Sequence, residues 1–260
     1  MLIHVINLDR QNDRWRTFLR LNERAGLQLD RFPAIDGHAL DVQRLIEHGI
    51  IKPSILKYYS AGHLGTAFSH LELWRKAINT GEVITVCEDD AILSANFAKN
   101  AQEILSRLKP DWDVILYGWN LDASIVIEVI NGLPGVLMCM DYWRERANED
   151  FAGQTYAGQP IKVRQAFGIM CYSISPKGAN ALMGHTLPLR DMEIRIPRVG
   201  RETGPPRIIP NAGIDIVMSA AYPRLQAFVS VPPLAISEKN IREGSASAET
   251  VLASLRNCPD

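Results

Sequence analysis

Apolar runs alternating with helical patterns constrain the fold of this chain more than any other feature. Four runs have the length and composition of strands: LIHVINL (2–8), LDRFPAIDG (29–37), GEVITVCEDD (81–90) and WDVILYGW (112–119). The last is apolar almost throughout, as expected for a strand that is buried on both faces. Strands that alternate with helices over the first 120 residues predict an α/β sandwich with a mainly parallel central sheet.

Three helices are expected between these strands. The first occupies the polar stretch that follows the first strand and ends at about Gly26. The second spans 64–80, where apolar residues recur at helical spacing and Gly81 provides the stop. The third spans 94–108, with Ser94 as its N-cap.

The second half of the chain is less regular. We expect a hairpin over 124–140 around an Asn-Gly turn, and then an insertion loop over 141–160. A strand over 163–175 and a short helix over 176–185, with Pro176 in its first turn, should follow. The remaining elements are a proline-rich loop over 187–210, a helix over 213–222 and a strand over 225–235. No internal repeat or linker is evident. We therefore expect one domain over residues 1–236 and a partly ordered tail over 237–260.

Composition excludes several classes of function. With 260 residues, 47% hydrophobic and 22% charged, the chain can build an ordinary globular core without disulfides or metals as staples. A formal charge of −1 provides no general attraction to nucleic acid, which we do not expect as a partner. The N-terminus does not resemble a secretory signal, no apolar run is long enough to span a bilayer, and the four cysteines are scattered. We expect a cytoplasmic protein.

The most unusual motif is the acidic triplet Glu88, Asp89 and Asp90, at the C-terminal end of a predicted buried strand. In open α/β sheets, ligands bind beyond this end of the strands. Carboxylates there suit a hard divalent cation, which could hold a nucleotide diphosphate. The alternative is that the triplet caps the next helix or forms surface salt bridges, and these residues alone leave both interpretations open.

Four stretches resemble glycosyltransferase family 25, the family of bacterial lipooligosaccharide galactosyltransferases and collagen galactosyltransferases. They are VINLDRQNDRW (5–15), FPAIDG (32–37), GHLGTAFSHLELWRKAI (62–78) and CEDDAIL (87–93). The combination of Gly-x-x-Gly, Ser-His, Trp and the acidic triplet is more specific than any single part. Weaker likeness extends the resemblance over most of residues 2–236, with gaps at 120–160 and 187–210.

The resemblance implies a GT-A-like nucleotide-binding sandwich in which an acidic motif holds Mn²⁺ or Mg²⁺ on a UDP-sugar. It implies an inverting transfer of galactose or glucose to a hydroxyl of a glycan or glycolipid acceptor, such as a lipooligosaccharide. Cell-surface glycan assembly would allow peripheral contact with the inner face of the membrane. The oligomeric state stays open.

The resemblance also suggests roles for the acidic residues. Asp90 is our first choice for a metal ligand and Asp89 or Glu88 the second, and one of these could instead orient a water or the donor sugar. Asp215 is proposed as the base for the acceptor hydroxyl, or else as a further metal ligand. The alternative for Asp215 is a carboxylate stabilised by the helix dipole at a helix N-terminus.

Donor-binding residues are expected near the first strand and the second helix. His70 is expected to contact the diphosphate or the donor sugar, although a satisfied core histidine explains it equally well. Asn7, Arg10 and Arg14 follow the first strand, where arginine can bind phosphate, although a solvated helix face also accounts for the two arginines.

Glycines and one Asp-Gly pair complete the expected donor site. Gly62 and Gly65 flank the start of the second helix, where exposed N–H groups can meet phosphate. Asp36 could approach the uridine or form an ordinary turn with Gly37. Segment 188–210 carries five arginines against three acidic residues; it could close over UDP or bind a phosphorylated acceptor, or be merely solvated.

Two other classes of function compete with the transferase. A metal-dependent phosphoester hydrolase could use the same carboxylates, but the six histidines form no HxH or HxxxH pattern, which counts against it. A non-catalytic module that binds a nucleotide sugar or glycan would retain the site without turnover.

Overall fold

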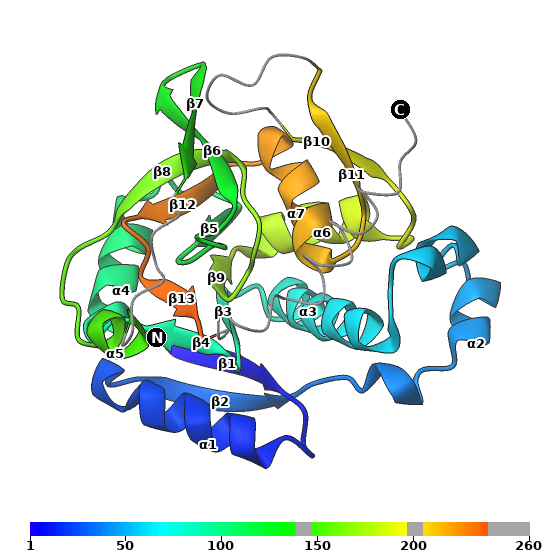
Figure 1. The fold of residues 1–260 in the computed structure, drawn as a ribbon, viewed down its shortest axis with the longest axis horizontal. Helices are drawn as coiled ribbons and strands as arrows, with labels where there is room; N and C mark the ends of the chain where they lie inside the picture. Colours follow the sequence, from blue (N-terminus) through cyan, green and yellow to red (C-terminus); the bar gives the residue numbers. More distant parts are fainter. Residues whose placement is uncertain (139–146, 197–204, 239–260) are drawn as a thin grey trace.

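The computed structural model describes residues 1–138, 147–196 and 205–238, and within them a nine-stranded sheet forms the centre of the molecule (Figure 1). Its strands, in spatial order, are β2 (Gln28–Pro33), β1 (Leu2–Asn7), β3 (Ile84–Glu88), β9 (Cys171–Ile174), β5 (Val114–Leu116), β12 (Ala227–Val231), β8 (Gln159–Gln165), β6 (Ser124–Ile130) and β7 (Leu133–Met138). Two small sheets pair β4 (Ala91–Leu93) with β13 (Ala235–Ser237) and β10 (Glu193–Ile196) with β11 (Arg207–Pro210).

Helices cover the sheet on both sides. They are α1 (Asn12–Leu21), α2 (Val42–Glu47), α3 (Ala61–Thr80), α4 (Phe97–Arg107), α5 (Ala147–Ala152), α6 (Pro176–Thr186) and α7 (Ile214–Ala221). Short 3₁₀ turns lie at η1 (Glu23–Ala25), η2 (Gly37–Ala39), η3 (Pro53–Lys57) and η4 (Tyr222–Arg224). Within the described residues, no helix is long and apolar enough to span a bilayer.

The α/β fold class is confirmed, and the sheet is mixed. β1 pairs in parallel with both β2 and β3, and β5 pairs in parallel with β12. β9 lies antiparallel between β3 and β5, and β8 lies antiparallel between β12 and β6. Most strands therefore run in one direction, with β7, β8 and β9 opposed to them.

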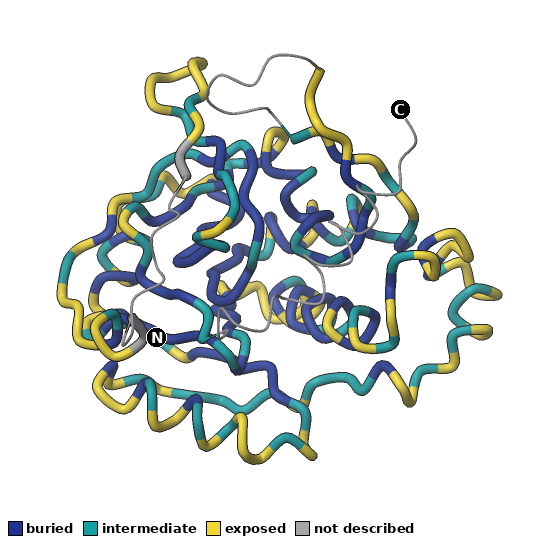
Figure 2. Tube along the Cα trace, viewed as in Figure 1, coloured by how far each residue is buried: buried dark blue, intermediate teal, exposed yellow. Residues whose placement is uncertain are grey.

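Alternation of side chains along the strands divides the core into two layers. On β5, Val114 and Leu116 face the layer that contains α3, α6 and α7, whereas Ile115 faces the layer that contains α1 and α4. The same alternation separates Val86 from Cys87 on β3. Figure 2 shows the middle of the sheet buried, with exposed positions gathered on the outer helices and on the β6–β7 hairpin.

Several predicted elements are confirmed with small shifts at their ends. Helix α3 ends at Gly81, which takes up a left-handed conformation with φ of +70°. The β6–β7 hairpin turns at Gly132, whose φ is +77°. Pro176 is the first residue of α6, as expected.

Other predictions are wrong. Asn96, not Ser94, precedes α4, because residues 91–93 form β4 and the Ser94 N–H donates to the Leu234 carbonyl at 3.0 Å. The strand expected over 163–175 is two strands, β8 and β9, whose connection contains Gly168 with φ of +81°.

Both expected loops of the second half contain regular structure. The loop expected over 141–160 includes α5 and the start of β8, and the loop expected over 187–210 includes β10 and β11. Residues 139–146, 197–204 and 239–260 lie outside the described part of the chain. The described part of the expected tail, Ser237 and Glu238, lies against the acidic triplet.

Candidate active site

The acidic triplet lies where three parallel strands end together. Asn7 is the last residue of β1 and pairs with Pro33, the last residue of β2. Glu88 is the last residue of β3 and pairs with Ile6 of β1. The fold thus brings the C-terminal ends of β1, β2 and β3 to one edge, the usual ligand-binding edge of such a sheet.

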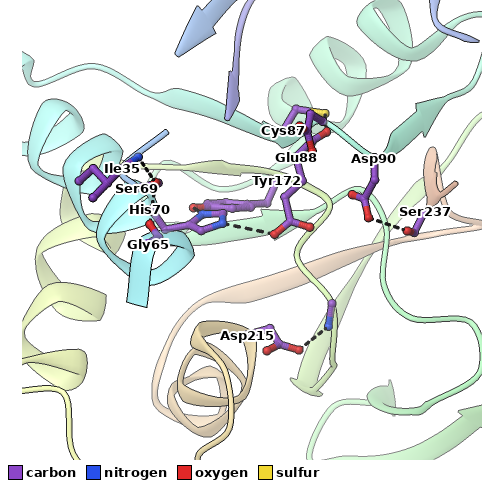
Figure 3. Close-up of polar contacts among 12 residues, drawn as sticks. Ile35, Gly65, Ser69, His70, Cys87, Glu88, Asp90, Tyr172, Asp215 and Ser237 are labelled. Carbon is purple, nitrogen blue, oxygen red and sulfur yellow. Dashed lines mark hydrogen bonds and ion pairs between the residues drawn. The ribbon is translucent and has the colours of Figure 1, made fainter. Parts of the chain in front are cut away.

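The three acidic side chains have different partners, and Figure 3 shows the carboxylates of Glu88 and Asp90 directed at two of them, His70 and Ser237. The Asp89 carboxylate accepts hydrogen bonds from Asn7 Nδ2 and from Arg14. The Glu88 carboxylate lies near His70, and the Asp90 carboxylate near Ser237. The strand β3 ends at Glu88 and residues 89–90 form a turn, so the three consecutive carboxylates come to lie beside different partners.

Asp89 is a buried anchor within a polar network. Its side chain is 9% exposed, whereas that of Arg14 is 50% exposed. The Asn7 amide oxygen accepts two bonds from Arg31, from Nε at 2.9 Å and from Nη2 at 2.6 Å. Burial of a carboxylate is costly without such partners, so the hydrogen bonds from Asn7 and Arg14 offset the cost of burying Asp89 at the sheet edge.

Glu88 is backed by a chain of buried side chains. His70 is fully buried; its Nε2 lies 3.5 Å from Glu88 Oε1 and its Nδ1 lies 2.9 Å from the Tyr172 hydroxyl. Trp74 Nε1 donates to the same hydroxyl at 2.8 Å. Since the indole N–H of tryptophan can only donate, the Tyr172 proton is available for a hydrogen bond to His70 Nδ1, while His70 Nε2 faces Glu88.

Burial also determines the protonation of Tyr172. It raises the pKa of this hydroxyl far above its ordinary value, so Tyr172 stays protonated at any physiological pH. His70 is therefore placed behind Glu88, where it can orient that carboxylate, and its contact with a substrate stays a prediction.

Asp90 is held by the end of β13. Ser237 Oγ donates to Asp90 Oδ2 at 3.0 Å, and the Glu238 N–H donates to the Asp90 carbonyl at 2.6 Å. Burial raises the pKa of the Glu238 carboxyl above its ordinary value, with the charge of Asp89 acting in the same direction. A fourth acidic side chain thus lies close to the triplet.

Asp215 lies in the first turn of α7 and faces the connection between β8 and β9. The Gly168 N–H, within this connection, donates to Asp215 Oδ2 at 3.0 Å. Two residues further along the same connection, the Met170 carbonyl accepts a hydrogen bond from the Glu88 N–H at 2.8 Å. Two residues of extended chain span about 7 Å. Asp215 and Glu88 therefore flank the same short connection and lie in one region of the fold.

Polar groups of α3 and η4 surround Asp215. Its negative charge raises the pKa values of the Tyr59 and Tyr222 hydroxyls, after the larger effect of burial. Burial lowers the pKa of His63, and the charge of Asp215 opposes that shift. The Tyr59 hydroxyl donates to Asn211 Oδ1 at 2.9 Å, which fixes the segment that leads into α7.

The glycines expected to bind phosphate have different environments. A side chain at Gly65 would place its Cβ 2.5 Å from the Ile35 carbonyl oxygen and 2.7 Å from the Gly37 nitrogen. Gly65 thus permits close packing of α3 on residues 35–37. Gly62, in the first turn of α3, has only the Ser60 hydroxyl nearby, at 3.6 Å.

Arg10 and Asp36 pair with each other at the rim of the site. The Arg10 guanidinium lowers the pKa of the Asp36 carboxyl, and the His38 N–H bonded to that carboxyl lowers it further. Arg10 is more than half exposed. Contacts of either residue with a nucleotide stay predictions.

The site has two carboxylates suited to a hard cation but no complete metal cluster. In the described ranges, no three His, Cys, Asp or Glu side chains are grouped so that they could hold an ion. The carboxylate oxygens of Glu88 and Asp90 suit Mn²⁺ or Mg²⁺, which commonly take one or two protein carboxylates together with substrate phosphates.

Some site residues carry no signal in the sequence. Arg31 and Ser237 reach Asn7 and Asp90 only through strand pairing between distant segments. Of the five arginines noted in 188–210, Arg190, Arg195 and Arg207 fall in described residues, and Arg195 and Arg207 lie on β10 and β11. Arg198 and Arg201 lie outside the described residues.

Comparison with known proteins gives consistent matches. The chain matches the sequence profile of "Glycosyltransferase family 25 (LPS biosynthesis protein)" over residues 1–196. A glycosyltransferase 25 family member of Drosophila pseudoobscura pseudoobscura is 30% identical over 125 residues, which cover 45% of this chain and 20% of the relative. Procollagen galactosyltransferase 2 of Homo sapiens is 29% identical over 126 residues, which cover 45% of this chain and 20% of the relative. The match spans about a fifth of the length of these relatives.

Proposed function

Because the chain belongs to glycosyltransferase family 25, we propose that it moves a hexose, galactose or glucose, from a UDP-sugar to a hydroxyl of a glycan or glycolipid, with inversion at the anomeric carbon. Three of the relatives are named as procollagen galactosyltransferases, which favours galactose. The family description favours a cell-surface glycan such as a lipooligosaccharide as acceptor.

A single observation carries the proposal. Glu88 is the last residue of β3 and Asp90 follows two residues later, and Asp215 lies across the short connection that both Glu88 and Asp215 contact. One group of carboxylates can therefore serve the diphosphate while a separate carboxylate serves the acceptor. This division suits a displacement reaction with a charged leaving group.

Glu88 and Asp90 would hold Mn²⁺ or Mg²⁺ against the donor diphosphate. A bound divalent cation would neutralise the charge that develops on the leaving UDP. Asp89 has a different part: with Asn7 and Arg14 it fixes the strand ends from which its neighbours project. His70, through Tyr172 and Trp74, would keep the Glu88 carboxylate in one orientation.

Asp215 would accept the proton of the acceptor hydroxyl. The acceptor oxygen then forms a bond to the anomeric carbon, and the bond from that carbon to the phosphate oxygen breaks with its electron pair leaving on UDP. The Gly168 N–H keeps one Asp215 oxygen in place, so the carboxylate has a fixed direction. Asp215 lies beyond the residues that match the family profile, so its role rests on the geometry.

Thermal unfolding with a panel of nucleotide sugars tests the donor site. We expect UDP-galactose or UDP-glucose with Mn²⁺ to stabilise the protein, and EDTA to abolish the effect. A ligand at 100 times its dissociation constant adds about 2.7 kcal/mol. Asp90→Asn should lose the Mn²⁺-dependent part, whereas Asp122→Asn, an exposed control, should keep it.

The same panel separates the competing functions. Transfer to an added glycan supports the transferase, release of free hexose without an acceptor indicates a hydrolase, and binding without turnover indicates a non-catalytic module. Absence of any shift with uridine ligands in a folded sample would contradict the donor site itself.

A further inference from the structure

The last described strand, β13, reaches the acidic triplet, although nothing in the local sequence suggests that it does. We propose that Ser237 is a positioning residue that fixes the orientation of Asp90 for donor binding. This inference rests on the proposed function and adds a residue from outside the part of the chain that matches the family profile.

Two contacts from consecutive residues hold Asp90. Ser237 Oγ donates to Asp90 Oδ2 at 3.0 Å (Figure 3). The Glu238 N–H donates to the Asp90 carbonyl at 2.6 Å. The register of β4 and β13 places Ser237 opposite Ala91, directly after Asp90. The hydroxyl thus binds the side chain while the next amide binds the main chain of the same residue.

The segment that carries Ser237 is itself firmly held. The Leu234 and Ala235 N–H groups both donate to the Tyr117 carbonyl, at 2.7 and 3.1 Å. The Ala235 carbonyl passes so close to Gly118 that a Cβ there would lie 2.2 Å from its oxygen. Leu234, Ala235 and Ile236 are buried. Ser237 therefore projects from a strand whose backbone is held in place, so its hydroxyl occupies a defined position.

A fixed hydroxyl matters because a carboxylate rotates easily about its side-chain bonds. A donor on one oxygen selects one orientation, and bonds to charged acceptors are stronger than those between neutral groups. Residues that orient ligand carboxylates in this way typically contribute 10- to 100-fold to metal affinity or activity. Ser237 would contribute through Asp90 without touching the substrate.

Three variants test this role, with binding as the first readout. Ser237→Ala should weaken the Mn²⁺-dependent binding of the UDP-sugar by roughly 10- to 100-fold, measured by calorimetry, while the unliganded protein unfolds at nearly the wild-type temperature. Ser237→Thr keeps the hydroxyl and should restore most of the affinity. Ser106→Ala removes an exposed serine hydroxyl on α4 and should change nothing.

A second background separates positioning from a general structural effect. In Asp90→Asn, removal of the Ser237 hydroxyl should produce no further loss of donor binding, because the group on which it acts is already changed. Wild-type affinity in Ser237→Ala, or an equal loss in the presence and absence of the Asp90 carboxylate, would overturn the inference. If the wild-type protein binds no UDP-sugar with Mn²⁺, the proposed function and this inference fail together.

Discussion

At the end of β3, three adjacent carboxylates have three different sets of neighbours. Asp89 is enclosed by Asn7 and Arg14, Glu88 faces His70, and Asp90 faces Ser237. The physical origin is the turn that follows β3 at residues 89–90, together with the pairing of β13 with β4. Substitutions of the same chemical kind should therefore have different consequences along the triplet.

Asp89→Ala should act mainly on stability. It leaves the Asn7 amide and the half-exposed Arg14 without their common acceptor, which we expect to lower the free energy of unfolding by roughly 1–3 kcal/mol. Urea denaturation measures this change. Asp13→Ala, an almost fully exposed aspartate on α1, is the control. A stable Asp89→Ala protein that cannot bind Mn²⁺ would instead make Asp89 a metal ligand.

His4 should make stability depend on pH. Burial lowers its pKa below the ordinary value of 6.5, and the side chain lies 2.7 Å from Asp30. As the pH falls below 6.5, His4 becomes protonated in the unfolded chain while it stays neutral in the folded protein. Acidification therefore lowers the free energy of unfolding. We expect the melting temperature to fall on acidification and to fall less steeply in His4→Gln. Equal slopes would contradict this assignment.

At the scale of elements, the close approach of α3 to residues 35–37 depends on glycine. Gly65→Ala would bring a Cβ to 2.5 Å from a backbone oxygen, so the helix or the turn must shift. Overpacking of this kind costs roughly 1–3 kcal/mol. Gly62→Ala, three residues earlier, would place a Cβ in ordinary contact with the Ser60 hydroxyl at 3.6 Å and should be neutral or stabilising. Chemical denaturation of the two variants measures the difference, and equal stabilities would contradict the packing role.

The local sequence pattern was sufficient to predict elements that are long or strongly periodic, such as α3, and the turn between β6 and β7. It failed where pairing is non-local: β4 is short, and its partner β13 lies near the other end of the described chain. The triplet's position at the sheet edge followed from the strand pattern. Arg31 and Ser237 could not be predicted, because their roles depend on which distant strands become neighbours.

At the scale of the whole molecule, β12 joins the two halves of the sheet. It pairs with β5 on one side and β8 on the other, and its Val229 is fully buried. The family profile ends at residue 196, before this strand. The central sheet therefore includes a strand from outside the matched part of the chain.

Val229→Ala should lower the stability of the whole molecule, by roughly 1–3 kcal/mol. If the described strands unfold as one unit, transitions followed by tryptophan fluorescence and by far-ultraviolet circular dichroism will shift together. Phe228, beside it on the same strand, is partly exposed, and Phe228→Leu provides a milder comparison. Separation of the two transitions would indicate independently folding parts.

The position of β12 also has a consequence for synthesis on the ribosome. Its neighbours β5 and β8 emerge long before residues 227–231, yet they cannot occupy their final places in the sheet until β12 enters between them. Until then, the facing edges of β5 and β8 expose unpaired main-chain groups. These two strand edges therefore stay without their common partner while residues 166–226 are synthesised, and exposed strand edges of this kind favour misfolding and aggregation.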